Sequence, residues 1–324
     1  MTRGTTGTGT TPFLTSTLGV LLGCLACCAL WGSAFPCIKI GYTLFSVGST
    51  DTASQMLFAG IRFTLSGVMV ILGTSAATRR PLLPSRHDWP AILVLALFQT
   101  FLQYFFFYQG LSKASGVTSS IIEGSANFIA ILFAALLFRS ERLTGRKVLG
   151  CVLGFAGVVL INLTSAGFNP AMRLDGEGFI LISTCAGAMS TCLIQRFSRS
   201  HNPVLLAGWQ FLVGGLVLTA TGLSGGGHLE PTGAGAWALL AYMGFISAAA
   251  YSLWSLLLRV NPVSRVSVFG FMNPVFGVIL SAILLAEGAV IEPWRAVAAL
   301  ALISVGIVIV NRAPAEKVAQ NAEP

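Results

Sequence analysis

The chain has very little charge. Charged side chains make up 9% of its 324 residues, whereas an ordinary soluble domain carries about 25%. Hydrophobic residues make up 55%, and the mean hydropathy is +0.81. This composition excludes a soluble domain and predicts a polytopic membrane protein.

Signatures of several kinds of chemistry are also missing. No zinc-protease histidine pair, P-loop or dinucleotide fingerprint occurs, so metal-assisted hydrolysis and direct use of ATP have no support. The seven cysteines all lie in apolar stretches, with neither metal-ligand spacing nor a disulfide framework. We therefore expect no metal, no cofactor and no catalytic residues. No ten-residue alternating pattern recurs, which excludes a transmembrane β-barrel.

Long apolar stretches dominate what is present. Each is about 20 residues long, enough to cross a hydrocarbon core of roughly 30 Å. The sequence predicts an all-α polytopic membrane protein with ten transmembrane helices, near 18–40, 53–75, 89–110, 116–138, 147–163, 178–195, 204–224, 236–258, 266–286 and 295–311. Residues 1–17 are predicted to be a disordered tail, 164–177 an external linker and 312–324 a second tail.

The basic residues are distributed unevenly along this pattern. If the N-terminus is cytoplasmic, 14 of the 19 lysines and arginines fall in cytoplasmic segments and 4 in external ones, while Arg62 lies within a span. This asymmetry predicts a plasma (inner) membrane protein with both termini in the cytoplasm. The net charge of +8 therefore reflects topology and does not indicate a nucleic-acid partner.

The segment 105–162 recurs in weaker form at 251–311. At a constant offset of 146 residues, the related pairs are Lys113 and Arg259, Asn127 and Asn273, Phe128 and Pro274, and Glu141 and Glu287. The first repeat covers 18–163 and the second 178–311, with five helices each. Because five is odd, the second copy enters the membrane in the opposite orientation, so the repeats are inverted. Inverted repeats are typical of transporters with a binding site between the halves.

Four motifs lie in order along the duplicated unit. They are Trp31-Gly-Ser-Ala-Phe-Pro-Cys-Ile-Lys39, Gly110-Leu-Ser-Lys-Ala-Ser, Ser140-Glu-Arg-Leu143, and Asn273-Pro-Val-Phe276 followed by Glu287. Together they resemble the EamA-type branch of the drug/metabolite transporter superfamily, over about 18 to 311. One departure is Phe128, which stands where the family has proline, so an expected break in the fourth helix is predicted to be lost.

The resemblance implies a secondary transporter for an amino acid, an organic acid or a drug-like solute. Alternating access of the two halves and export are expected, driven by either a proton gradient or the solute's own gradient, with the lipid bilayer as surroundings. Two alternatives from other classes are an intramembrane enzyme and a sensor or scaffold. The string Gly222-Leu-Ser224-Gly-Gly226, with His228 nearby, matches a nucleophile elbow, but that motif requires a strand leading into a helix.

Two ionisable residues lie inside predicted spans, Arg62 and Glu123. An ionisable group in hydrocarbon costs at least about 2.5 kcal/mol, so each is a candidate functional residue. Both are placed in the outer half of the membrane, where they can meet and where Lys39 can reach them. Glu123 is either a proton-coupling or substrate-binding carboxylate or one half of a static ion pair with Arg62. Lys39 is either an interfacial residue or a substrate contact. Two cations against one carboxylate favour an anionic or zwitterionic solute.

Helical spacing adds a layer of amides. Gln99 and Gln103 are four residues apart, as are Glu123 and Asn127, so each pair shares a helix face. We predict a cavity lined by these four residues and Asn273, although hydrogen bonds between helices would explain any single amide equally well. Aromatic side chains are candidates for apolar walls, Trp254 above all, then Tyr104, Trp209 and Tyr251.

Glu141 and Glu287 occupy equivalent positions in the two repeats. We expect both to be structural, pairing in exposed positions with Arg142 and Arg146 in the first repeat and with Arg295 in the second. Exposed ion pairs contribute little to stability.

Overall fold

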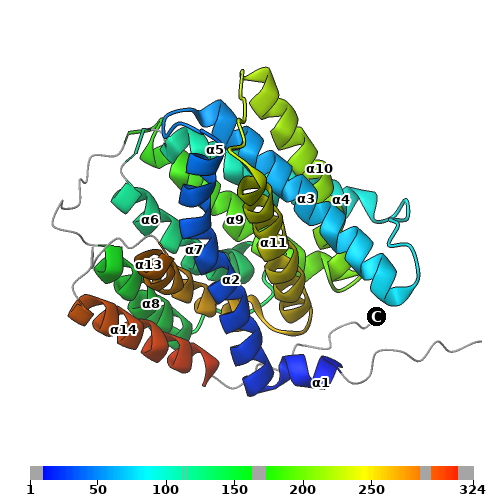
Figure 1. The fold of residues 1–324 in the computed structure, drawn as a ribbon. Coiled ribbons are helices and arrows are strands. Elements are labelled where there is room, and N and C mark those ends of the chain that lie inside the picture. Colours follow the sequence, from blue (N-terminus) through cyan, green and yellow to red (C-terminus); the bar gives the residue numbers. More distant parts are fainter. Residues whose placement is uncertain (1–9, 112, 115, 163–172, 285–292, 313–324) are drawn as a thin grey trace, which may run out of the picture.

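The structure is a computed structural model that describes residues 10–111, 113, 114, 116–162, 173–284 and 293–312. Within these ranges all regular structure is helical (Figure 1), which confirms the predicted all-α class. Seven of the described helical spans are long and apolar enough to cross a membrane, and shorter apolar helices accompany them. Glu287, most of the predicted 164–177 linker and nearly all of the second tail lie outside the described residues.

The helices follow the predicted spans closely, although three spans are divided into shorter pieces. The first half contains α1 (Thr10–Thr15), α2 (Thr17–Leu44), α3 (Thr52–Thr78), α4 (Trp89–Leu95), η1 (Ala96–Leu102), α5 (Gln103–Leu111), α6 (Gly116–Gly124), α7 (Ala126–Leu132), η2 (Phe133–Leu137) and α8 (Gly145–Asn162). Here α4, η1 and α5 form the third span, and α6, α7 and η2 the fourth. Helix α1 lies within the segment predicted to be a disordered tail.

The second half repeats this order. It contains α9 (Glu177–Phe197), α10 (Pro203–Ser224), α11 (Ala234–Val260), α12 (Val263–Ser267), η3 (Val268–Met272), α13 (Asn273–Leu284) and α14 (Pro293–Asn311). Here α12, η3 and α13 form the ninth span.

Local sequence explains where several helices begin. Asp51 caps α3, because its side chain accepts a hydrogen bond of 3.0 Å from the backbone N–H of Ser54. The hydrogen bonds from Ser54 hold the pKa of Asp51 below its ordinary value. Asn202 caps α10 in the same way, and Pro203 follows at the first helical position, where its missing N–H costs nothing.

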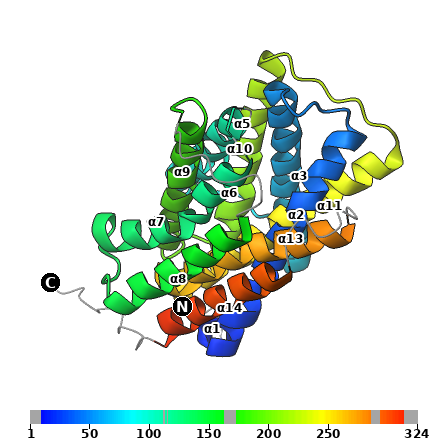
Figure 2. The same cartoon turned by 90° about the vertical axis from the view of Figure 1, so that its left-hand side faces the viewer.

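The packing of the helices follows a two-fold relation between the repeats. Helix α2 packs against α11 and α13, and its counterpart α9 packs against α5, α6 and α7. The equivalent helices α3 and α10 contact each other, as do α8 and α14, and both views show these pairs side by side (Figures 1 and 2). These contacts are what an inverted duplication requires.

Glycines allow the paired helices to approach closely. A Cβ atom at Gly215 of α10 would overlap the backbone nitrogen of Thr64 in α3. A Cβ at Gly150 of α8 would lie 2.7 Å from the carbonyl oxygen of Gly306 in α14. Without a hydrophobic force between helices in lipid, such close backbone packing is a main source of helix association.

The fourth span is broken despite the absence of proline. Helix α6 ends at Gly124, and α7 begins at Ala126, with Ser125 in a turn between them. The Oγ of Ser125 donates a hydrogen bond of 2.6 Å to the carbonyl of Ile122. Such a bond competes with the helical ladder. The predicted loss of this break was therefore wrong, and the break matches the 3₁₀ segment η3 that precedes Asn273 in the second repeat.

Glu141 lies in a buried network and not in an exposed pair. Its side chain is 5% exposed, and it accepts a hydrogen bond of 2.8 Å from Lys147 Nζ. It also accepts hydrogen bonds from the backbone N–H and the Oγ of Ser264, at the start of α12. Glu141 therefore joins the first repeat to the second, which corrects the predicted local and exposed role.

Candidate functional site

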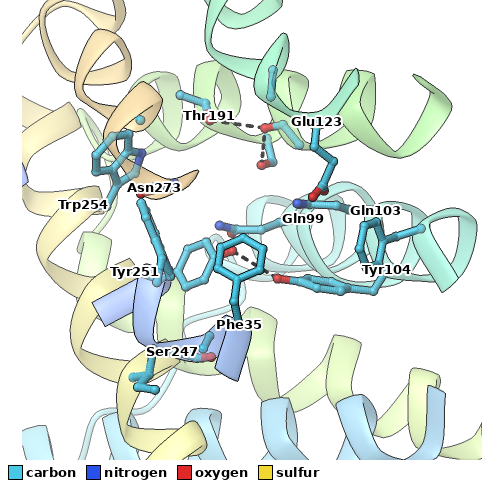
Figure 3. A pocket seen from close by; sticks show the side chains of 18 of the residues that line it. Phe35, Gln99, Gln103, Tyr104, Glu123, Thr191, Ser247, Tyr251, Trp254 and Asn273 are labelled. Carbon is cyan, nitrogen blue, oxygen red and sulfur yellow. Dashed lines mark hydrogen bonds between the residues drawn. The ribbon is translucent and has the colours of Figure 1, made fainter. Parts of the chain in front are cut away.

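A cavity of about 240 Å³ lies between the two repeats (Figure 3). Its lining comes from α2, α3, the third and fourth spans, α9, α11 and the ninth span. Both repeats therefore contribute walls, as expected of a site at the interface of inverted repeats. The volume is smaller than the roughly 300–1,000 Å³ typical of pockets for drug-sized ligands.

Seven of the eight residues predicted as site candidates line this cavity. They are Arg62, Gln99, Gln103, Glu123, Asn127, Trp254 and Asn273. The eighth, Lys39, is exposed near the end of α2 and is not among the lining residues. In this structure the cavity therefore holds one cation and one carboxylate, where the sequence predicted two cations.

Arg62 is a buried cation held by aromatic rings. The residue is 5% exposed, and its guanidinium carbon lies 4.3 Å from the ring centre of Phe63 and 5.9 Å from that of Tyr104. Rings so placed attract the cation through their negative faces. The Nε atom has no hydrogen-bond partner in the described part of the chain. Because a buried donor without a partner is costly, this arrangement favours an acceptor supplied by the solute.

Glu123 reaches the same cavity from α6 without pairing with Arg62. Among the described residues no ion pair or hydrogen bond joins the two side chains. Figure 3 places Glu123 on the same side as Tyr104, across from Trp254 and Asn273. The structure therefore does not contain the static ion pair that was one of the two alternatives for Glu123, and both side chains line the cavity.

The amides share this lack of protein partners. Gln99 lies on the π-helical segment η1, and Gln103 begins α5 one turn later. Within the described ranges, neither side chain nor that of Asn127 forms a hydrogen bond, and the buried Oδ1 of Asn273 has no partner. Buried polar groups are normally satisfied. The alternative of hydrogen bonds between helices is therefore unsupported, and these amides are available to a solute.

An aromatic row runs along the cavity from Arg62 to Trp254. Tyr104 and Tyr251 bring their hydroxyl oxygens to 3.4 Å. The ring centre of Trp31 lies 4.9 Å from that of Tyr251 and 5.0 Å from that of Trp254, both edge to face. Charged groups thus gather at one end of the row, and indole rings at the other.

Sequence reasoning missed several lining residues and misplaced one. Trp31 and Phe35 belong to the first-helix motif but were not singled out as site residues, and Thr191 and Ser247 gave no signal because small polar residues are common in membrane helices. Trp209 does not line the cavity. Its Nε1 donates a hydrogen bond of 2.8 Å to the carbonyl of Leu82 near the end of the bundle.

The nucleophile-elbow string has no catalytic geometry. Ser224 ends α10 and donates its hydroxyl proton to the carbonyl of Thr221 at 2.9 Å. The string follows a helix, and no strand is present in the described ranges, so the geometry that exposes such a serine is missing.

Both halves of the chain match a known family of membrane proteins. The model of the EamA-like transporter family matches residues 17–163 and again residues 175–312. The chain belongs to the EamA-like transporter family. The predicted resemblance and the ten-helix, two-repeat architecture are thereby confirmed, and the protein is a multi-pass membrane transporter of the drug/metabolite transporter superfamily.

Similar proteins agree with this assignment. An uncharacterized transporter of Archaeoglobus fulgidus is 30% identical, covering 87% of this chain and 95% of its own. The aromatic amino acid exporter YddG of Ancylobacter novellus is 27% identical, covering 84% and 93%. A crystal structure with 20% identity has a TM-score of 0.73 over 91% of this chain and 96% of its own, which supports the fold. Because these relatives are named transporters, the family evidence points away from an enzyme.

Proposed function

We propose that the protein is a secondary transporter that exports an amino acid across the plasma membrane by alternating access of its two five-helix repeats. The observation that carries this proposal is that one cavity is lined by two side chains of opposite charge, Arg62 and Glu123, neither of which forms an ion pair among the described residues. A zwitterion supplies a carboxylate for the first and an ammonium for the second. It would complete both contacts at once.

The lining supports an amino acid with an aromatic side chain. Rings of Tyr104, Tyr251, Trp31 and Trp254 form one continuous wall, and aromatic rings prefer edge-to-face or offset contacts with other rings. The relative in Ancylobacter novellus is named an aromatic amino acid exporter. Organic acids and drug-like solutes are the alternative substrates if none of these amino acids is transported.

The charge distribution supports the orientation of the proposal. With both termini cytoplasmic, the Glu141 and Ser264 network lies on the cytoplasmic side, where it joins the repeats. Breaking this contact would open the cavity to the cytoplasm. Rocking of inverted repeats about a fixed central site is the general mechanism for such folds.

Glu123 is the proposed proton-coupling group. It is the acidic residue among those lining the cavity, so it can hold a proton while the ammonium group is absent and release it when the solute binds. Exchange of a proton for a solute at one carboxylate would couple export to the proton gradient.

The proposal is tested by flux of labelled tyrosine, tryptophan and phenylalanine in proteoliposomes, with and without an imposed proton gradient. Wild-type protein should give gradient-dependent flux, and Glu123→Gln should lose that dependence. If the flux is unchanged by the proton gradient and by the Glu123→Gln substitution, Glu123 is not the coupling group. Absence of flux for every amino acid would overturn the amino-acid assignment.

A further inference from the structure

The end of the cavity away from Arg62 carries polar groups that the binding of a zwitterion does not use. Asn273 and Trp254 lie on one side of the cavity in Figure 3, opposite Glu123 and Tyr104. Trp31 belongs to the same end, because its ring contacts that of Trp254. If the charged groups of an amino acid bind at the Arg62 end, its side chain points here.

Three of these polar groups lack protein partners in the described part of the chain. The Nε1 of Trp31 and the Oδ1 of Asn273 are buried and form no hydrogen bond. The amide of Asn127 also lines the cavity without one. An indole N–H is a donor, whereas an amide both donates and accepts. This end therefore offers both functions and no charge of its own.

The two asparagines come from opposite repeats, and the side chain of Asn127 packs against Gly270, three residues before Asn273. They are related by the internal offset of 146 residues, and each stands at the start of a helix after a break, Asn127 in α7 and Asn273 in α13. A Cβ atom at Gly270 would overlap the Asn127 side chain, so the glycine makes the room that the amide occupies. The duplicated helix breaks therefore place both asparagines at the cavity.

A neutral group that donates and accepts hydrogen bonds would satisfy these atoms. A phenol hydroxyl does both, and an indole N–H donates to an amide oxygen. A bare phenyl ring would leave the buried groups unpaired, and sites built around buried hydrogen-bonding groups reject analogues that lack the matching group. The aromatic rings around them accommodate the rest of the side chain.

We infer that Trp31, Asn127 and Asn273 form a specificity subsite that recognises a polar group on an aromatic side chain. This inference rests on the proposed amino-acid transport and names its preferred substrates as tyrosine and tryptophan over phenylalanine. The ammonium and carboxylate groups of the substrate bind at Glu123 and Arg62, and the subsite forms hydrogen bonds with the far end of the substrate's side chain.

The test compares kcat/KM for labelled tyrosine and phenylalanine in proteoliposomes, because the two differ by one hydroxyl. Wild-type protein should prefer tyrosine by about ten-fold or more. The ratio should fall toward one in Asn273→Leu and Asn127→Leu, and by a smaller factor in Trp31→Phe. Asn311→Leu is the matched control and should keep the wild-type ratio, because its amide bonds to the Ile307 carbonyl in α14, away from the cavity.

The outcomes separate this inference from the proposed function. Transport of both amino acids with no wild-type preference, or with an unchanged ratio in all three variants, would overturn the subsite while leaving amino-acid transport intact. Failure to transport either amino acid would count against the proposed function itself. If the asparagine variants do not fold, Trp31→Phe decides the matter, because it keeps a six-membered aromatic ring and removes the indole N–H together with the five-membered ring.

Discussion

Arg62 is the residue on which recognition of the solute depends. Its guanidinium is buried beside the rings of Phe63 and Tyr104, and no carboxylate of the described residues pairs with it. An ionisable residue within a membrane span is costly and is by default a candidate functional residue. The carboxylate of the solute is the partner that the proposed function supplies.

Replacing this cation should impair transport strongly. Arg62→Gln removes the charge-assisted hydrogen bonds to the solute carboxylate, each of which contributes about 1.5–3 kcal/mol. We therefore expect kcat/KM for tyrosine to fall about 10- to 100-fold in proteoliposome flux. Arg86→Gln, in the exposed loop before α4, is the control and should keep wild-type flux. Equal flux in both variants would show that Arg62 does not bind the solute.

A second residue-scale prediction concerns Asp88, outside the membrane spans. Partial burial raises the pKa of this carboxyl, but hydrogen bonds from Ser85 and His201 outweigh that effect and hold the pKa below its ordinary value. Because the pKa of Asp88 is lower in the folded protein than in the unfolded one, the ionised carboxylate stabilises the fold at pH values above the unfolded pKa of about 3.9. This stabilisation is lost as the pH falls through the folded pKa. The Tm of wild type should therefore exceed that of Asp88→Asn near pH 6, and the difference should shrink below about pH 4. A difference that grows on acidification would contradict this account.

Helical spacing and the internal duplication were sufficient to predict the amides that line the cavity, but not most of its other lining residues. Gln99, Gln103 and Asn127 line it because residues four apart share a helix face, and Asn273 because the duplication carries it to an equivalent place. Lys39 was a candidate for the site but does not line the cavity. Spacing along the sequence gives the depth of a residue in the membrane, but not the direction in which its side chain points within the bundle. The missing ion pair of Arg62 and Glu123 also depends on how separate helices approach, which one sequence does not encode locally.

Helices in this fold are held together by close backbone contact. Gly215→Ala in α10 would force a methyl group against the Thr64 backbone of α3. Overpacking of this kind costs about 1–3 kcal/mol, so we expect a lower Tm for the purified protein. Gly73→Ala is the matched control, since nothing lies within 4 Å of its Cβ position in α3, and it should not lower the Tm. Equal Tm values for the two variants would contradict tight packing at the α3 and α10 contact.

The Glu141 network provides a second test at this scale. Glu141 accepts hydrogen bonds from Ser264 across the repeat interface, so the two residues should be energetically coupled. A double-mutant cycle with Glu141→Gln and Ser264→Ala should give a coupling free energy of about 0.5–3 kcal/mol in thermal unfolding. Additive effects of the two substitutions would mean that this contact does not join the repeats. The contact was missed in the sequence because the two residues are 123 positions apart.

The whole molecule combines two closely packed repeats with a central cavity that contains buried polar atoms without partners among the described residues. Glycines allow α3 to pack closely against α10, and α8 against α14, which are the equivalent helices of the two repeats. Between them, the Nε of Arg62, the Nε1 of Trp31 and the Oδ1 of Asn273 line the cavity without a hydrogen-bond partner in the described part of the chain, and they remain available to a solute. Satisfaction of these groups by the solute is the energetic basis of the proposed binding, and rocking of the repeats would move the solute across.

The most direct test of this account is ligand-dependent thermal stabilisation of the purified protein, comparing tyrosine with tyramine, which has the same ring and amine but no carboxylate. A ligand that binds only the folded state raises stability by about 2.7 kcal/mol at 100 times its Kd. We predict that tyrosine raises the Tm of wild type, that tyramine raises it much less, and that Arg62→Gln loses the response to tyrosine. Equal stabilisation by tyramine, or none by any amino acid, would contradict the central claim that the unpaired charges of this cavity bind a zwitterion.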